Sequence, residues 1–147
     1  MNILQLAITK TWGRDGIQIE NLCYSISQLA PEINLTFFCA KNSILYQRLK
    51  ASPFNYVMAP LKTKIDPRFT FKLIRICKRK KINLTHIHSP SALTIAIIAD
   101  KTGNLPPFVF TFPIKKRKQT LYKYNYHKTK KIICVSSQAE EVINSNC

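Results

Sequence analysis

Two histidines, His86 and His88, stand one residue apart at the end of a short apolar stretch, and Ser89-Pro90 follows them directly. The stretch 84–88 has the length and composition of a buried strand, and Ser-Pro opens an apolar segment of helical length. Residues at the carboxyl end of a buried strand, facing a helix N-terminus, lie where open α/β sheets bind their ligands. The sequence therefore predicts a ligand-binding edge at 86–90.

The two imidazoles point to the same side of the sheet if the strand is regular, because alternate residues share a face. Two histidines could bind a metal, but no third ligand is recognisable and the chain has only 7 Asp and Glu residues. No metal site is therefore expected. A histidine inside a strand is most often a core residue, which is the interpretation for His86. His88 lies nearer the strand end and is the one expected to contact a ligand.

The loop Trp12-Gly13-Arg14-Asp15-Gly16 precedes a segment of helical periodicity and is a second candidate site. Backbone N–H groups and a helix N-terminus in such a loop can bind a phosphate, although a tight turn explains the glycines equally well. The dinucleotide fingerprint needs a third glycine and another spacing, so NAD is not supported and no cofactor is expected. Nucleophile elbows, Walker loops and paired carboxylates do not occur either, and no catalytic residue can be named.

Short apolar runs alternate with amphipathic segments along the whole chain. Strands are predicted at 3–8, 33–39, 56–59, 84–88, 108–112 and 132–135. Helices are predicted at 19–30, at 43–50, from Asp66-Pro67 onward, at 92–101, within the basic tract after Pro113, and after Ser136 or Ser137. This alternation indicates an α/β fold with a doubly wound, parallel, Rossmann-like sheet. The 147 residues suffice for one domain with its own core, spanning 1–147.

Several global features narrow the class of protein. The apolar content of 46% argues against disorder, and no apolar run reaches the roughly 18–20 residues of a membrane-spanning helix. The first residues lack the basic leader of a signal peptide, so the interpretation is a cytoplasmic protein. Five cysteines occur without a C-x-x-C pair, which favours reduced thiols over zinc or a disulfide framework.

The net charge of +16 is concentrated in two segments. Nine basic residues and one acid lie in 62–81, and eight basic residues without an acid lie in 115–131, together 17 of the 23 Lys and Arg. Such tracts indicate a polyanionic partner: acidic lipid headgroups, nucleic acid or phosphate-bearing substrates. On the helix that starts at Asp66-Pro67, one stripe at helical spacing is apolar, and a second stripe is basic, formed by Arg68, Lys72, Arg75 and Arg79.

Four segments together resemble a known family. They are W-G-R-D-G at 12–16, H-I-H-S-P at 86–90, P-P-F-V-F-T-F at 106–112, and K-K-I-I-C-V-S-S-Q-A-E-E-V-I at 130–143. In this order they are similar to the N-terminal, acceptor-side domain of GT-B glycosyltransferases, of the subfamily-4-like, group 1 type. The resemblance extends over the whole chain.

This resemblance implies transfer of a sugar from a nucleotide-sugar donor to a glycan acceptor, which is lipid-linked or part of a lipopolysaccharide in many members. The family's C-terminal domain, which binds the donor through an E-x7-E motif, is expected to be absent from 1–147. The chain alone is therefore expected to be inactive. The resemblance assigns the acceptor side and the phosphate loop to Trp12, Gly13, Gly16, His88, Ser89 and Thr111.

At two places the chain departs from the family pattern, so the family's catalytic residues cannot be assigned to positions in this sequence. Members often carry a histidine after the fifth strand, where this chain reads Thr111-Phe112-Pro113-Ile114, so the histidine is lost or the register is shifted. In the first loop Gln18 stands where glutamate is common, and Asp15 replaces a glycine. Catalytic residues accordingly remain unassigned.

The basic stripe Arg68, Lys72, Arg75 and Arg79 is expected to hold the domain on an anionic membrane, peripherally at its inner face, because each basic residue near such a surface contributes on the order of 1 kcal/mol. Two alternatives stay open. One is a basic nucleic-acid-binding module, which the lack of a recognisable RNA- or DNA-binding motif disfavours. The other is a truncated remnant without function.

Overall fold

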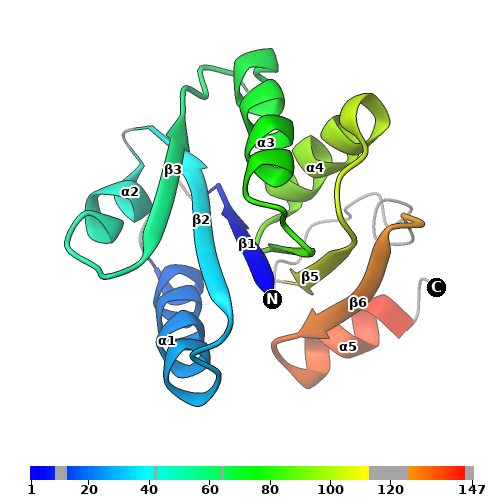
Figure 1. Ribbon diagram of the computed structural model, residues 1–147. Helices are drawn as coiled ribbons and strands as arrows, with labels where there is room; N and C mark the ends of the chain where they lie inside the picture. The colour runs from blue at the N-terminus through cyan, green and yellow to red at the C-terminus, as the bar shows by residue number, and fades with distance from the viewer. Residues whose placement is uncertain (9–12, 42, 64, 113–125, 145–147) are drawn as a thin grey trace.

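The computed structural model describes residues 1–8, 13–41, 43–63, 65–112 and 126–144 (Figure 1). Strands and helices alternate along the chain from the first residues onward. The strands are β1 (Asn2–Ala7), β2 (Asn34–Ala40), β3 (Asn55–Ala59), β4 (Leu84–Ile87), β5 (Phe108–Phe112) and β6 (Thr129–Cys134). The helices are α1 (Arg14–Leu29), α2 (Ile44–Leu49), α3 (Pro67–Arg79), α4 (Pro90–Gly103) and α5 (Ser137–Asn144).

The six strands form one sheet in the order β3-β2-β1-β4-β5-β6, and all five pairings are parallel. The predicted doubly wound parallel sheet is confirmed. The chain winds from β1 toward β3 on one side, then returns to the centre and winds from β4 toward β6 on the other. The strand order therefore reverses between β1 and β4, which is the topological switch point of the sheet.

Side-chain caps set where the helices begin. Ser43 Oγ accepts a hydrogen bond from the backbone N–H of Tyr46, and Asp66 Oδ1 accepts one from the N–H of Arg68. Ser89 Oγ accepts one from the N–H of Ala92, so Ser89 and not Ser91 caps α4. These groups satisfy N–H donors that the first helical turn leaves unpaired. Local chemistry therefore placed three helix starts correctly.

Two element boundaries differ from the prediction by more than two residues: α1 begins at Arg14 instead of 19, and β6 begins at Thr129 instead of 132. Helix α1 begins at Arg14, so Gly16 lies buried in its first turn instead of in the loop. At the end of α4, Gly103 is still helical and Asn104 takes the left-handed conformation, with φ of 52°. Asparagine tolerates this backbone region better than most residues, which suits it to the end of the helix. The predicted helix in the basic tract 115–131 lies largely outside the described residues, and the described end of the tract, 126–131, is not helical and contains the start of β6.

The sheet has a packed layer on each face. On one face α1 and α2 cover Ile3, Phe37 and Cys39. On the other, α3, α4 and α5 cover Leu4, Phe38 and Phe110. The apolar stripe of α3 is buried as predicted, because its spacing keeps these side chains on the inner side of the helix; it comprises Phe69, Leu73, Ile76 and Cys77.

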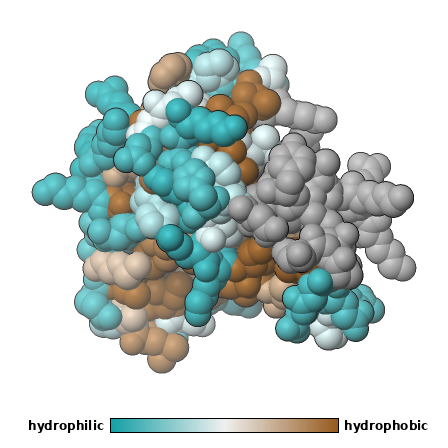
Figure 2. Space-filling view, turned by 90° about the vertical axis from the view of Figure 1, so that its right-hand side faces the viewer, coloured by the Kyte–Doolittle hydropathy of each residue, from teal (hydrophilic) through white to brown (hydrophobic). Residues whose placement is uncertain are grey.

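Hydrophilic side chains lie around several hydrophobic patches on the face shown in Figure 2. Within the described ranges, no helix combines the length and apolar character needed to cross a membrane. The cysteines Cys23, Cys39, Cys77 and Cys134 are free. Burial raises the pKa of Cys23 and Cys77 to about 12 and that of Cys39 to about 11, so these three thiols remain protonated near neutral pH.

Candidate functional site

The carboxyl ends of β1 and β4 lie side by side at the switch point of the sheet. The backbone N–H of His88 donates to the carbonyl of Leu6 at 3.1 Å, which carries the pairing of the two strands past the end of β4. One residue further, Ser89 Oγ donates to the carbonyl of Ile8 at 3.5 Å. The predicted ligand-binding segment 86–90 therefore borders the crevice where such sheets bind ligands.

Two helices have their N-termini at this edge, because each follows directly on one of the two central strands. Helix α4 starts after β4, where Ser89 caps it and Ser91 Oγ lies 3.2 Å from Ser89 Oγ. Helix α1 starts after β1, and its N-cap, Gly13, is exposed and makes no side-chain cap. A Cβ added at Gly13 would meet nothing within 4 Å, so space is open beside this N-terminus. Unpaired N–H groups and the helix dipole favour an anionic group at such a position.

A layer of buried polar side chains crosses β1, β4 and β5 beneath this edge, and we call Gln5, His86, His88 and Thr111 the polar layer. His88 Nε2 lies 2.6 Å from Gln5 Oε1, and His86 Nε2 lies 2.8 Å from Thr111 Oγ1. The two imidazole rings lie 4.1 Å apart between centroids. All four residues share one face because β1 pairs with β4 with Gln5 opposite His86.

Both histidines are neutral near pH 7. Burial lowers the pKa of His86 to about 4. Burial, and secondarily the neighbouring His86, lowers the pKa of His88 well below its ordinary value. In a neutral imidazole one ring nitrogen donates a hydrogen bond and the other accepts one. In each histidine, the nitrogen that bonds Gln5 or Thr111 takes one of these two roles and the second nitrogen takes the other. The polar layer can exchange hydrogen bonds with a ligand but offers it no charge.

Both histidines are buried, His86 as the sequence predicted, and it is His86 rather than His88, the expected ligand contact, that lines a cavity. His86 and Thr111 line a cavity of about 510 Å³ between α1 and the sheet. His88 lies deeper, is 5% exposed, and bonds Gln5. Gln5 was missed as a site residue, although a polar residue within an apolar strand was a visible signal.

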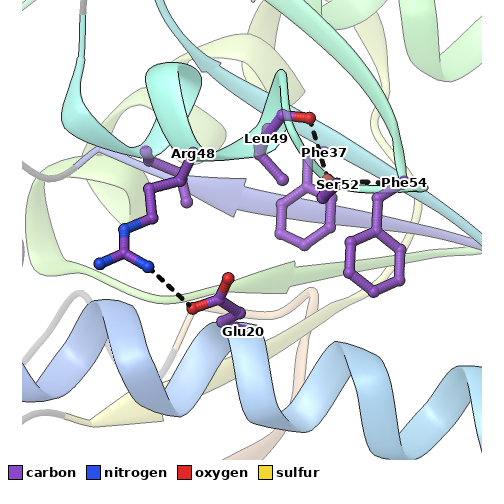
Figure 3. Close-up of a pocket in the computed structure, with 7 residues that line it drawn as sticks. Glu20, Phe37, Arg48, Leu49, Ser52 and Phe54 are labelled. Carbon is purple, nitrogen blue, oxygen red and sulfur yellow. Dashed lines mark hydrogen bonds and ion pairs between the residues drawn. The ribbon is translucent and has the colours of Figure 1, made fainter.

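The remaining predicted site residues are placed as follows. Gly13 and Ser89 border the carboxyl edge, Gly16 is buried within α1, and Trp12 lies outside the described residues. A second pocket, between α1 and α2, holds only about 10 Å³ (Figure 3). Its walls include Phe37 and Phe54, whose rings pack 5.5 Å apart, and the ion pair of Glu20 with Arg48 at 3.8 Å. It is a gap in the core packing and too small for a ligand.

The basic stripe of α3 is exposed along its whole length, as expected, and we call Arg68, Lys72, Arg75 and Arg79 the basic ridge. Arg68 pairs with Asp66 at 3.0 Å, which holds the pKa of that carboxyl at about 2. Phe71 lies beside the ridge on the same helix and is 68% exposed. A large aromatic side chain among cations gives this surface both an apolar and an electropositive component.

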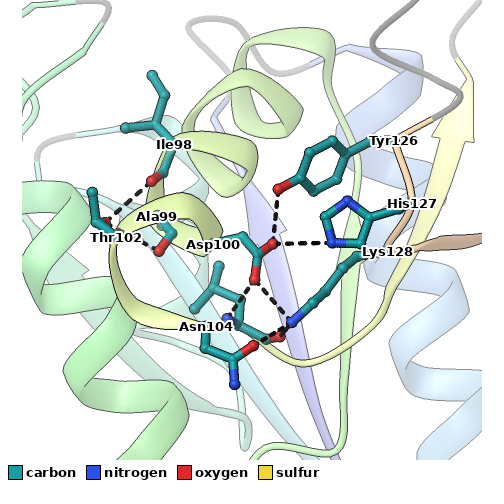
Figure 4. A network of polar contacts seen from close by, with 9 residues as sticks. Ile98, Ala99, Asp100, Thr102, Asn104, Tyr126, His127 and Lys128 are labelled. Carbon is teal, nitrogen blue, oxygen red and sulfur yellow. Dashed lines mark hydrogen bonds and ion pairs between the residues drawn. The ribbon is translucent and has the colours of Figure 1, made fainter.

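A third polar cluster joins the end of α4 to the start of β6 (Figure 4). Asp100 accepts hydrogen bonds from the N–H of Leu105 and the hydroxyl of Tyr126, both at 2.8 Å, and its carboxylate lies 3.0 Å from Lys128 Nζ. Burial, together with the hydrogen bond to Asp100, raises the pKa of Tyr126 to about 12. The cluster fixes β6 at the sheet edge. Within the part of the chain that the structure describes, no three metal-ligating side chains gather.

Comparisons with known proteins identify the fold. No family model and no curated protein matches the chain. Among solved structures, Anabaena HepE in complex with UDP and glucose matches with a TM-score of 0.73 at 11% identity, over 99% of this chain and 41% of its own. The lipopolysaccharide outer core galactosyltransferase WaaB matches with a TM-score of 0.70 at 15% identity, over 99% and 42%. A putative UDP-N-acetylglucosamine 2-epimerase from Listeria monocytogenes matches with a TM-score of 0.63 at 10% identity, over 98% and 41%.

The chain therefore has the Rossmann-like fold of one half of a GT-B glycosyltransferase, as the sequence resemblance predicted. It spans about two fifths of the length of the structures that it matches. An epimerase shares the fold, so the fold by itself does not decide the reaction.

Proposed function

We propose that residues 1–147 are the acceptor-side half of a glycosyltransferase that moves a sugar from a nucleotide-sugar donor to a glycan acceptor. The observation that carries the proposal is the match of 99% of the chain to one half of a galactosyltransferase. The sequence motifs W-G-R-D-G and H-I-H-S-P support it, because they fall at the two helix N-termini beside the switch point. Donor binding requires polypeptide beyond these residues, on the same chain or on a second one.

Acceptor contacts are assigned to the carboxyl edge of β1, β4 and β5. Gly13 lies at the first of these edges, His88 and Ser89 at the second, and Thr111 at the third. The sequence resemblance also assigns Trp12, which lies outside the described residues, and Gly16, which is buried within α1. His88 acts indirectly, because it is buried against Gln5 and orients the strand end from below. Ser89 and Gly13 border the crevice itself. Two helix N-termini at one edge suit an acceptor that carries a phosphate, such as a lipid-linked glycan.

The proposed location of the domain is the cytoplasmic face of an anionic membrane, to which the basic ridge would bind. Helix α3 runs back from the carboxyl edge of the sheet, since Pro67 follows the end of β3. A membrane bound along the ridge therefore lies near the edge that holds the acceptor. Exposed Phe71 supports this surface, because aromatic side chains favour the boundary between headgroups and acyl chains.

The test is a transfer assay with labelled nucleotide sugars and a membrane lipid extract. The chain is assayed alone and together with the polypeptide encoded directly downstream, which is first inspected for an E-x7-E motif. Label is expected in the lipid fraction only when both polypeptides are present. Transfer by the folded chain alone would show that it is more than an acceptor half. Folded protein that gives no transfer in either case would contradict the transferase assignment.

A second candidate function is nucleic-acid binding, which the net charge of +16 favours. This candidate predicts binding to duplex or single-stranded nucleic acid that weakens steeply with salt, with no preference for anionic over neutral vesicles. The exposed Phe71 and the transferase fold favour the membrane instead.

A further inference from the structure

The cavity of about 510 Å³ lies on the face of the sheet that α1 partly covers, beside the first turns of α1 and the carboxyl-terminal parts of β4, β5 and β6. One side of α1 forms its helical wall, through the polar side chains Gln18, Asn21 and Ser25. These residues stand three and four positions apart, so they form one stripe along the helix. The opposite wall is the sheet, where His86, Thr111 and Ile133 come from β4, β5 and β6. Its volume falls within the range of small-molecule sites.

The cavity wall carries no charge. Of the described residues that line it, none is Lys, Arg, Asp or Glu, in a chain whose net charge is +16. His86, the one titratable group among them, is neutral near pH 7. A phosphate or carboxylate would find no counter-charge here, although it would find many on α3. The ligand that fits is therefore uncharged.

The wall combines hydrogen-bonding groups with two exposed apolar side chains. Ile17, on α1, is 49% exposed, and Ile133, on β6, is 43% exposed. Hydroxyl, amide and imidazole groups lie between them. A sugar ring has the matching chemistry, because its faces present C–H groups and its edge presents hydroxyls. An apolar helix from another protein would instead leave these polar groups without partners, at a cost of roughly 1–3 kcal/mol for each.

The polar layer holds the floor of the cavity in place. Thr111 Oγ1 is bonded to His86, the His86 ring packs on His88, and His88 is bonded to Gln5. The floor therefore keeps one arrangement before a ligand arrives, which reduces the entropy lost on binding.

We infer that this cavity, lined by Gln18, Asn21 and Ser25 on one wall and by His86 and Thr111 on the other, binds an uncharged saccharide unit. Its assignment to the acceptor glycan rests on the proposed function. The cavity would hold an uncharged sugar unit of the acceptor, while the helix N-termini at the carboxyl edge would hold the end that carries a phosphate. Sugar binding in the cavity can be measured without any transfer reaction, so the two are tested separately.

The experiment is an NMR titration of the chain labelled at isoleucine δ-methyl groups. The probes are uncharged disaccharides (maltose, lactose and diacetylchitobiose), with glucose 6-phosphate as the charged counterpart. We expect saturable shifts of the Ile17 and Ile133 methyls, with dissociation constants on the order of millimolar. The methyl of Ile65, which is 50% exposed near α3, is expected to stay unchanged.

Matched variants separate the cavity from the rest of α1. Ser25→Leu fills the cavity, whereas Ser27→Leu makes the same change at an exposed position outside it. Ser25→Leu and Thr111→Val are each expected to weaken binding about tenfold or more, and Ser27→Leu to leave it unchanged. Because Ser25 is itself exposed, the variant should fold, and the methyl of buried Ile95 reports whether it does.

Three results would overturn the inference. One is the absence of shifts at Ile17 and Ile133 with every uncharged disaccharide, or shifts that Ser25→Leu does not weaken. Another is tighter binding of glucose 6-phosphate than of the uncharged sugars. The third is a change of the two methyls with protein concentration alone, which would show that a second copy covers the cavity. Transfer activity with an empty cavity would refute only this inference, and sugar binding without transfer would refute only the proposed function.

Discussion

His88 Nε2 and Gln5 Oε1 lie 2.6 Å apart across β4 and β1, although 83 residues separate them in the chain. Gln5 is completely buried and His88 is 5% exposed, so the contact lies within the protein core. The second polar atom of the amide, Gln5 Nε2, is buried and has no hydrogen-bond partner among the residues that the structure describes. The pair therefore fixes the ends of two central strands together but does not satisfy all of its own polar groups.

The two buried histidines should make the protein less stable in mild acid. The pKa of His86 is about 4 in the folded state, against about 6.5 in the unfolded chain, and that of His88 is also lowered. Between these values the unfolded chain binds more protons, so stability is complete above pH 6.5 and falls as the pH drops toward 4. His86 alone should contribute roughly 3 kcal/mol to the loss. Urea unfolding at a series of pH values measures this slope.

Two variants test whether the buried imidazoles cause the change of unfolding free energy with pH. His86→Gln retains a polar side chain that can bond Thr111. It should reduce the change in the free energy of unfolding between pH 4 and 6.5. His127→Gln, at a histidine that is 69% exposed, should leave it as it is. An unchanged slope in His86→Gln would contradict the assignment. The carboxyls of Asp66 and Asp100, whose pKa values are lowered, lose their contribution at lower pH and do not explain a change above pH 4.

The contact of Gly103 with Ile74 should decide how closely α3 and α4 pack. A Cβ at Gly103 would lie 2.6–2.8 Å from three side-chain atoms of Ile74, which is 8% exposed. Gly103→Ala should therefore lower the free energy of unfolding by about 1–3 kcal/mol. In an Ile74→Ala background the same substitution should cost nothing, because the clash is gone. Gly13→Ala is the matched control, expected to cost less than about 1 kcal/mol since its Cβ meets open space. Additive effects at Gly103 and Ile74 would exclude the close contact.

The Asp100 cluster should stabilise the attachment of β6. Asp100→Ala removes the acceptor for Leu105 N–H, Tyr126 hydroxyl and Lys128 Nζ, and should cost about 2–4 kcal/mol. Lys101→Ala, at the exposed neighbouring position, should change stability by less than about 0.5 kcal/mol. A double-mutant cycle of Asp100→Ala with Lys128→Met measures their coupling, which should exceed about 0.5 kcal/mol. Zero coupling would show that the 3.0 Å contact does not contribute to stability.

Neutralising the basic ridge should weaken binding to anionic vesicles. The variant Lys72→Gln/Arg75→Gln/Arg79→Gln removes three charges, each worth on the order of 1 kcal/mol near an anionic surface, so affinity should fall about a hundredfold. Removing the same number of charges elsewhere, at exposed Lys50, Lys130 and Lys131, should have a smaller effect. Co-sedimentation with vesicles of phosphatidylglycerol and phosphatidylcholine measures both. Equal losses would indicate that net charge matters and the ridge does not.

Local sequence determined most of the fold. The alternation of apolar runs and amphipathic segments gave the order of strands and helices, because a strand and a helix impose different periods on buried side chains. Ser43, Asp66 and Ser89 marked helix starts because capping depends on residues at most three positions away. The spacing of Phe69 and Leu73 on α3 predicted its buried side, and that of Arg68 and Lys72 its exposed one.

Tertiary structure alone decided the site. The strand order places β1 beside β4, and no local sequence pattern encodes this pairing. The pairing sets Gln5 opposite His86 and brings the Gln5 side chain to His88. The next pairing brings β5 beside β4 and so Thr111 to His86. Sequence placed the two histidines on one face, but only the tertiary structure shows that His86 lines the cavity and that His88 bonds Gln5. Side chains that meet across a sheet depend on long-range pairing, whereas caps and periodicity depend only on near neighbours.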